Sequence, residues 1–489
     1  MNDNAAAVLK TFEELDAVPR RSKNEGPVRQ WLTSWAAEQG FDHRVDNAGN
    51  VIVTVPATPG HESAPTVVLQ GHMDMVCEKR PEVVHDFSSD PIRLVYEEEW
   101  VRADGTTLGA DNGIAIALAM RIAEDPEVVH PPLELLFTVD EETGLTGALE
   151  LEENSLSGRT LINLDSEEDD SLIVGCAGGR NSSVRIPIDR DTRGSAQTVL
   201  ELTVSGLSGG HSGIDIHRNL ANANRILARV LQQVEEVTPY RLCSLSGGTA
   251  HNAIPRDATA RLTVADGAVE EVKSQIAEFE GVVQAEYRRE ESGLRLDLDA
   301  GVEANRGQET EKGEGAPLTV EASQRVVDVL LALPHGVFRM SDDIEGLVET
   351  SDNVATVGLE EDRLSVLVSQ RSSVPSQLEA ISAKINAVTR LAGGTAHYES
   401  EYPAWTPNMD SALLSKAVAV FEEVTGAKPK VQAIHAGLEA GVIGAKHEGM
   451  DMISLGPTIE GAHTPEERLH LESVSRIWEV LAALLAALS

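Results

Sequence analysis

Cysteine is scarce in this chain of 489 residues, which contains only Cys77, Cys176 and Cys243 and no CxxC spacing. So few cysteines argue against a disulfide framework and a thiolate-bound zinc site, and they fit a reducing compartment such as the cytoplasm. If the chain binds a metal ion, its ligands must therefore be His, Asp and Glu side chains.

Long apolar runs are also missing. The longest, at 113–120 and 480–488, are far shorter than the ~20 residues that cross a bilayer. The first residues, MNDNAAAVLK, show no basic stretch followed by an apolar run, so we expect no secretory signal. These features predict a soluble, cytoplasmic protein.

Positive charge is in short supply as well. The chain has 40 Lys and Arg residues against 79 Asp and Glu, which gives a formal net charge of −39. Nucleic acids and anionic membranes bind positive patches, so the composition disfavours both as partners. The acidity is consistent with high solubility and does not identify a substrate.

The order of apolar segments indicates three parts. The chain is longer than the roughly 250–300 residues at which one hydrophobic core stops growing. We expect a catalytic α/β domain in two pieces, 1–185 and 401–489, interrupted by an α+β insert at 186–400.

In the first piece short apolar runs alternate with helical patterns, which is typical of a layer of parallel strands. The expected strands are 51–55, 66–70, 133–139 and 161–164, and the expected helix is 113–124. The insert has strands that alternate polar and apolar residues, which suits sheets solvated on one face. These are 199–204, 258–264, 294–298 and 364–368, with helices at 219–234 and 322–333.

Several strand ends carry acids or imidazoles, at the edge where α/β proteins assemble their sites. His72 and Asp74 are two apart and share a face of extended chain. A carboxylate at Asp74 can fix the tautomer of a metal-bound His72. Asp165 directly follows the apolar run at 161–164. Asp111 precedes the expected helix 113–124, where it can act as a helix cap or as a metal ligand.

A third acidic segment, Asp140-Glu141-Glu142, crowds three carboxylates at one strand end. Adjacent anions repel one another unless water or a cation separates them, so a solvated acidic loop and a metal site both remain open. Near the C-terminus His463 precedes Thr464, Pro465 and Glu467, a spacing that predicts a capping box and a helix start.

Together these residues offer two sets of three ligands that share one carboxylate. One set is His72, Asp111 and Asp165, and the other is Asp111, Glu142 and His463. Three protein ligands per ion leave a position for a bridging water, as catalytic zinc sites do. Zinc suits these ligands, and manganese or cobalt are possible substitutes.

Five motifs in this order resemble the co-catalytic zinc peptidases that include carnosinase and peptidase T. They are HxDxV at 72–76, GADNG at 109–113, DEETG at 140–144, Asp165, and GAHTPEERL at 461–469. The resemblance covers nearly the whole chain and implies a two-zinc exopeptidase-like fold. It also implies a dipeptidase that cuts Xaa-His and other unblocked dipeptides with a zinc-bridged water.

The same resemblance implies roles for individual residues. Glu141 would be the general base, Asp74 would orient His72, and the insert would be a lid that also carries a homodimer contact. The residues that match the family's substrate-binding positions are His211, Asn252, Arg371 and Gly437.

Two other activities remain open at this point. GxSxG at 206–210 matches the nucleophile elbow of serine hydrolases, but no helical pattern follows it at once as an elbow requires. An N-acyl amino acid deacylase would use the same metal ligands and would not require a free amino group in its substrate. A scaffold that only binds peptides is disfavoured because Glu141 is present.

Overall fold

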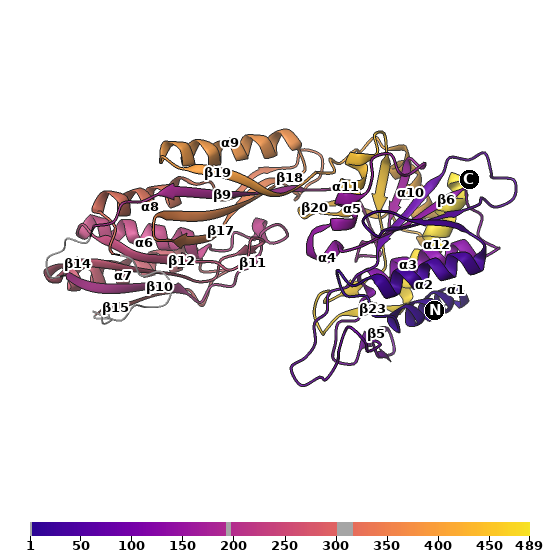
Figure 1. Cartoon of the computed structure of the whole chain (residues 1–489), viewed down its shortest axis with the longest axis horizontal. Coiled ribbons are helices and arrows are strands. Elements are labelled where there is room, and N and C mark those ends of the chain that lie inside the picture. The colour runs from indigo at the N-terminus through magenta and orange to yellow at the C-terminus, as the bar shows by residue number, and fades with distance from the viewer. Residues whose placement is uncertain (1, 192–196, 301–315) are drawn as a thin grey trace. The chain divides into compact units, whose positions relative to one another are not determined.

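The computed structural model describes residues 2–191, 197–300 and 316–489. The chain forms two compact units. The first unit contains Met1–Cys176 and Trp405–Ser489, and the second unit contains Ala177–Ala404. The first and last helices, α1 (Asp3–Asp16) and α12 (Leu471–Leu488), both lie in the first unit (Figure 1).

The first unit is built on an eight-stranded sheet with the order β1-β2-β6-β3-β7-β21-β8-β20. Strands β3 (Val67–His72), β6 (Leu133–Thr138) and β7 (Thr160–Asn163) are parallel to one another. Every residue of β3 and β6 is buried, as expected for strands covered on both faces. The C-terminal segment supplies β20 (Lys430–Ile434) and β21 (Asp451–Ser454), and β21 lies between β7 and β8 (Ser171–Cys176).

Strand β2 (Val51–Val55) differs from the expectation of an all-parallel layer. It pairs antiparallel with β6 and with β1 (Asp42–Val45). A parallel pair needs a crossover of a dozen or more residues, usually a helix. The segment 56–66, which joins β2 to β3, contains no helix, so β2 takes the other direction.

Helix α3 (Ala110–Glu124) crosses from β3 to β6 and packs on β3 and α1. Its residues Asp111 and Asn112 have non-helical backbone angles, so the regular helix begins where the sequence predicts, near Gly113. The first unit also contains the helices α2 (Gly26–Gln39), α10 (Ala412–Thr425) and α11 (Glu439–Lys446).

A small antiparallel sheet in the first unit has the order β22-β23-β5-β4. Strands β22 (Ile459–Glu460) and β23 (Arg468–His470) form a hairpin, and β23 pairs with β5 (Trp100–Ala103), which pairs with β4 (Leu94–Tyr96). The helix start predicted at Thr464 is therefore wrong. Residues 461–467 form the hairpin loop, and Thr464 stabilises a turn by accepting a hydrogen bond from the Glu466 amide.

The second unit contains a nine-stranded antiparallel sheet with the order β15-β10-β14-β12-β17-β18-β9-β19, and a ninth strand, β16, pairs with β17. Its strands are β9 (Gly178–Pro187), β10 (Gln197–Ser205), β12 (Arg241–Gly247), β14 (Ala258–Ala265), β15 (Arg295–Ala300), β16 (Gly336–Met340), β17 (Val348–Leu359), β18 (Arg363–Ser372) and β19 (Thr395–Tyr402). Buried and partly exposed residues alternate along most of β10, as the sequence predicts.

Helices pack on this sheet and bury its apolar residues. Helix α6 (Ala223–Val237) contacts β10, β14 and β17, while α8 (Val320–Ala332) contacts β12. Helix α7 (Val269–Glu286) contacts β15, and helix α9 (Pro375–Leu391) contacts β9, β18 and β19. A separate two-stranded ribbon joins β11 (Gly210–His211) to β13 (Ala253–Ile254). Among the described residues, no helix is long and apolar enough to cross a membrane.

Candidate metal centre

The carboxyl ends of three parallel strands carry three of the five predicted ligands, His72, Glu142 and Asp165. His72 is the last residue of β3, and Asp165 follows β7 by two residues. Glu141 and Glu142 follow β6, in the short helix α4 (Glu141–Gly144). Parallel strands end at one edge of a sheet, which explains why residues far apart in the sequence meet here.

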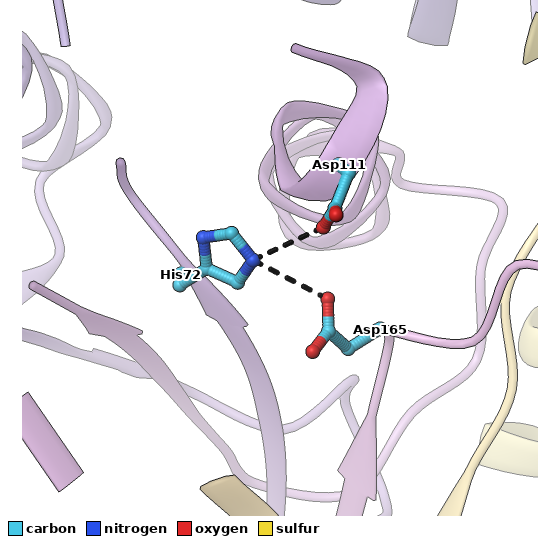
Figure 2. Close-up of side chains that lie close together, drawn as sticks. All are labelled: His72, Asp111 and Asp165. Atoms are coloured by element: carbon cyan, nitrogen blue, oxygen red, sulfur yellow. Dashed lines mark hydrogen bonds and ion pairs between the residues drawn. The ribbon is translucent and has the colours of Figure 1, made fainter. Parts of the chain in front are cut away.

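The first predicted ligand set is assembled around His72, which is 1% exposed. The His72 Nε2 atom lies 3.1 Å from Asp111 Oδ1 and 3.5 Å from Asp165 Oδ1. Figure 2 shows the two carboxylates converging on this one ring nitrogen from α3 and from the end of β7. The three ligand atoms all lie within 4.8 Å of one another, a geometry that can hold a metal ion.

The second set forms around the other oxygen of Asp111. His463 Nε2 lies 3.1 Å from Asp111 Oδ2 and 3.1 Å from Glu142 Oε2. These ligand atoms also lie within 4.8 Å of one another. Asp111 thus directs one oxygen to each set, so it can bridge two cations. Asp111 is not the N-cap of α3, because the N-cap residue is Gly109.

Asp74 connects His72 with the acidic segment. Its Oδ1 lies 3.4 Å from His72 Nδ1, and its main-chain oxygen lies 3.1 Å from the same nitrogen. The carboxylate also accepts hydrogen bonds from the Glu141 amide at 3.0 Å, the Glu142 amide at 3.3 Å and Ser22 Oγ at 2.7 Å. Asp74 therefore fixes both the ring of His72 and the start of α4.

The five predicted ligand residues lie in two groups that could each hold a cation. One buried carboxylate oxygen, Glu142 Oε1, accepts no hydrogen bond from the described residues, which is costly for a carboxylate unless a cation is present. Imidazole nitrogens with carboxylate oxygens are ligands that zinc, manganese and cobalt accept.

Without a cation, the site holds protons instead. Burial by itself lowers the pKa of His72, but Asp165 and hydrogen bonds to Asp111 raise it well above its usual value. Hydrogen bonds to Asp111 and Glu142 raise the pKa of His463 to about 11. Burial raises the pKa of Asp165 to about 6. Metal ligation requires neutral imidazole and ionised carboxylate, so binding a cation here releases protons.

Comparisons with known proteins show the family of this chain. Residues 68–487 match the model of Peptidase family M20/M25/M40. The chain belongs to this family. It is a metallopeptidase, and the family resemblance and the fold class predicted from its motifs are confirmed.

Two relatives are similar to this M20/M25/M40 chain over nearly their whole length. One is the cytosol non-specific dipeptidase of Escherichia coli K12, 38% identical, with 97% of this chain and 96% of the relative aligned. The other is the crystal structure of aminoacylhistidine dipeptidase from Vibrio alginolyticus, with a TM-score of 0.87, 37% identity and coverage of 99% and 96%. Aminopeptidase PepT from Bacillus cereus shares the fold, with a TM-score of 0.58, 17% identity and coverage of 99% and 98%.

Three of the four predicted substrate-binding residues of this M20/M25/M40 chain lie in the second unit. His211 Nδ1 accepts hydrogen bonds from the Gly213 and Ile214 amides at 3.2 and 3.0 Å, so its Nε2 carries the proton and can donate. Burial and the nearby Arg371 lower the pKa of His211 to about 4, which keeps the ring neutral. Arg371 is 7% exposed and donates to Tyr402 Oη at 2.8 Å.

The other two predicted residues lie in loops. Asn252 is exposed and precedes β13, and its main-chain oxygen accepts a hydrogen bond from the Ser212 amide at 2.8 Å. This bond ties Asn252 to the turn that follows His211. Gly437 belongs to the first unit and lies between β20 and α11. The substrate-binding roles of all four residues stay predictions.

Sequence patterns missed the polar residues beneath the ligands. Asn112 accepts a hydrogen bond from the His72 amide at 3.1 Å and donates to Leu164 O at 3.0 Å, which joins three ligand-bearing segments. Glu439, which is fully buried, accepts from Gln70 Nε2 at 2.7 Å and Thr138 Oγ1 at 2.6 Å. Two sequence features could have indicated these residues: Asn112 belongs to the GADNG motif, and Glu439 is an acid at the start of the apolar helix α11.

Proposed function

We propose that this chain is a two-zinc dipeptidase that hydrolyses Xaa-His and other unblocked dipeptides. The observation that carries the proposal is the double engagement of Asp111, which faces His72 with one oxygen and His463 with the other. The names of the Escherichia coli and Vibrio alginolyticus relatives support a dipeptide as the substrate.

Zinc ions bound by the two sets, with manganese or cobalt as possible substitutes, would supply Lewis acidity to the attacking water and to the scissile carbonyl. Glu141 belongs to neither of the two sets, although it lies among their atoms with His72 and Glu142. Burial raises its pKa well above the usual value, and the neighbouring Asp165 and Glu142 add to the effect. A carboxylate with a raised pKa can take a proton from water and return it to the leaving amine.

Four residues are proposed to bind the substrate. The Nε2–H of neutral His211 would donate to the carbonyl oxygen as negative charge develops there. Arg371 and Asn252 would bind the terminal carboxylate, for which the planar guanidinium is well suited. Gly437, which has no side chain, would line the pocket.

We further propose a cytoplasmic homodimer whose contact is carried by the insert, predicted at 186–400. The relative's name, cytosol non-specific dipeptidase, supports the location. The net charge of −39 disfavours nucleic acid and anionic membrane surfaces as partners. The proposed domain limits are 1–185 and 401–489 for the two parts of the catalytic domain and 186–400 for the insert, whereas the compact units divide at 176/177 and 404/405.

The proposal is tested with the purified protein and a small substrate panel: β-alanyl-histidine, several α-dipeptides, a tripeptide and an N-acetyl amino acid. Each is assayed with zinc, with a chelator, and with zinc restored. We expect dipeptide cleavage that the chelator abolishes and zinc restores. Cleavage of the N-acetyl substrate alone would replace the dipeptidase with an N-acyl amino acid deacylase, and cleavage unaffected by the chelator would refute the metal mechanism.

A further inference from the structure

A buried carboxylate outside both ligand sets holds the loop that carries Asp111. Glu467 is 2% exposed and accepts three main-chain hydrogen bonds. Its Oε2 accepts from the Leu108 amide at 2.7 Å and the Gly109 amide at 2.9 Å, and its Oε1 accepts from the Asp111 amide at 3.2 Å. Both oxygens are thus used on a single stretch of backbone.

The Gly109 and Asp111 amides lie at the cap and in the first turn of α3, where amides have no partner within the helix, and the Leu108 amide directly precedes them. Helix α3 has Gly109 at its cap position, with no side-chain capping hydrogen bond from that residue. Glu467 supplies the acceptors from a distant part of the chain instead. The side chain of Asp111 is therefore not needed as a cap, and its two oxygens face His72 and His463.

The carbonyl group of the same residue, Gly109, is also held. The Gly109 carbonyl accepts a hydrogen bond from Arg20 Nη2 at 2.6 Å, and Arg20 is paired with Asp16 at 2.8 Å. Both side chains are buried. Glu467 thus holds the amide of Gly109 and Arg20 holds its carbonyl group, two residues before Asp111.

Glu467 also belongs to the segment that delivers His463. Both residues lie in the loop 461–467 of the β22–β23 hairpin. His463 has a positive φ of 65° and a side chain that is 54% exposed, so little packing holds it in place. The three hydrogen bonds of Glu467 tie its loop to the Asp111 loop and bring His463 within 3.1 Å of Asp111 Oδ2.

We propose that Glu467 is a positioning residue for the ligand set Asp111, Glu142 and His463, and that its loss weakens metal binding by this set more than by the other. The inference rests on the two-metal site proposed above. The other set has separate supports, because Asn112 joins His72 to the backbone before Asp165, and Asn163 accepts from the Asp165 amide at 3.3 Å. Those contacts do not involve Glu467.

The test measures zinc binding to the full-length metal-free protein by competition with a chromophoric chelator. The variants are Glu467→Gln, the control Glu466→Gln and the reference His463→Ala. Glu466 is adjacent in the same loop, its side chain is 69% exposed, and it pairs with Arg80 at the surface. Circular dichroism and the Tm of each metal-free protein show whether the fold is kept. If Glu467→Gln does not fold, Glu467→Asp carries the same test, because it keeps the carboxylate and shortens its reach.

In Glu467→Gln we expect one zinc dissociation constant to rise about 10- to 100-fold and the other to change less than about threefold, as for other residues that support metal ligands. The affected constant should be the one lost in His463→Ala, and Glu466→Gln should match the wild type. Equal weakening of both sites, or a Glu467→Gln protein that binds like Glu466→Gln, would overturn the inference alone. A wild type that binds no zinc would overturn the proposed function with it.

Discussion

At the scale of single residues, the centre depends on carboxylates that make two contacts each. Asp111 faces two imidazoles, and Asp74 contacts both His72 and the amides of Glu141 and Glu142. A carboxylate has two oxygens in a fixed plane, so each such residue sets the relative positions of two partners. Replacing Asp111 or Asp74 changes two contacts at once, whereas replacing the side chain of Glu141 leaves both predicted ligand sets intact.

Replacement of Glu141 by Gln should therefore separate catalysis from metal binding. The backbone amide of residue 141 still donates to Asp74, and both ligand sets keep their atoms. We expect zinc content to stay at the wild-type level and kcat to fall by about 10²- to 10⁴-fold, the usual contribution of a general base. Steady-state kinetics and metal analysis measure the two quantities. The exposed Glu153→Gln serves as control, and near-wild-type turnover in Glu141→Gln would mean that another group is the base.

Glu439 should give the metal-free protein a pH-dependent stability. Burial, together with Asp165 and Asp74, raises its pKa to about 7, although His72 and the hydrogen bond from Thr138 act in the opposite direction. Between about pH 4.5 and pH 7 the folded chain keeps a proton that the unfolded chain releases. Stability therefore falls as the pH rises through this range, by at most about 3 kcal/mol, and is constant above it.

Glu439→Gln removes that titration. We expect the Tm of the metal-free variant, relative to the wild type, to increase from pH 5 to pH 8. Glu448→Gln, an exposed change just beyond the same helix, should show no such trend. A constant difference between Glu439→Gln and wild type across these pH values would show that Glu439 is ionised throughout.

At the scale of secondary-structure elements, the close approach of α3 to β3 depends on a glycine. A Cβ atom at Gly71 would collide with Asn112 Oδ1 and lie 2.8 Å from Ala115 Cβ. Gly71→Ala should therefore destabilise the first unit by about 1–3 kcal/mol, the usual cost of overpacking. Thermal unfolding measures the change.

Gly281→Ala is the matched control in α7 of the second unit, since nothing lies within 4 Å of a Cβ atom there. Because alanine favours helix, this control should stabilise the protein by roughly 0.5–1 kcal/mol. An unchanged Tm in Gly71→Ala would mean that α3 can shift away from β3 without cost.

The elements also show where sequence reasoning succeeds and fails. Parallel strands β3, β6 and β7 are predictable because buried runs with a helix between them have few other arrangements. The partner of Glu467 was not predictable, because its spacing from Thr464 fits a local capping box while its true partners lie near residue 109. Short-range patterns contain no information about such a partner. The antiparallel direction of β2 was readable in principle from the short connection 56–66.

At the scale of the whole molecule, the dominant feature is the net charge of −39. Self-repulsion of like charges destabilises a compact state, and salt screens it. Raising ionic strength from 0.01 to 0.15 M shortens the screening length from about 30 to about 8 Å. We expect the Tm of the metal-free protein to rise by about 2–4 °C, the shift that 1 kcal/mol produces in units of this size.

Sodium and potassium chloride should act alike if screening is the cause. A Tm that stays constant or falls over this range of salt would show that the negative charges are already far enough apart to leave stability unaffected.

The order of strands in the first unit has a consequence for protein synthesis. Strand β21 lies between β7 and β8, yet it leaves the ribosome after the entire second unit, and His463 follows it. When His72, Asp111, Glu142 and Asp165 of a nascent chain have left the ribosome, the chain still lacks the central strand β21 and the imidazole of His463. If these residues hold the metal ions as proposed, the peptidase cannot become active before its C-terminal segment has been translated.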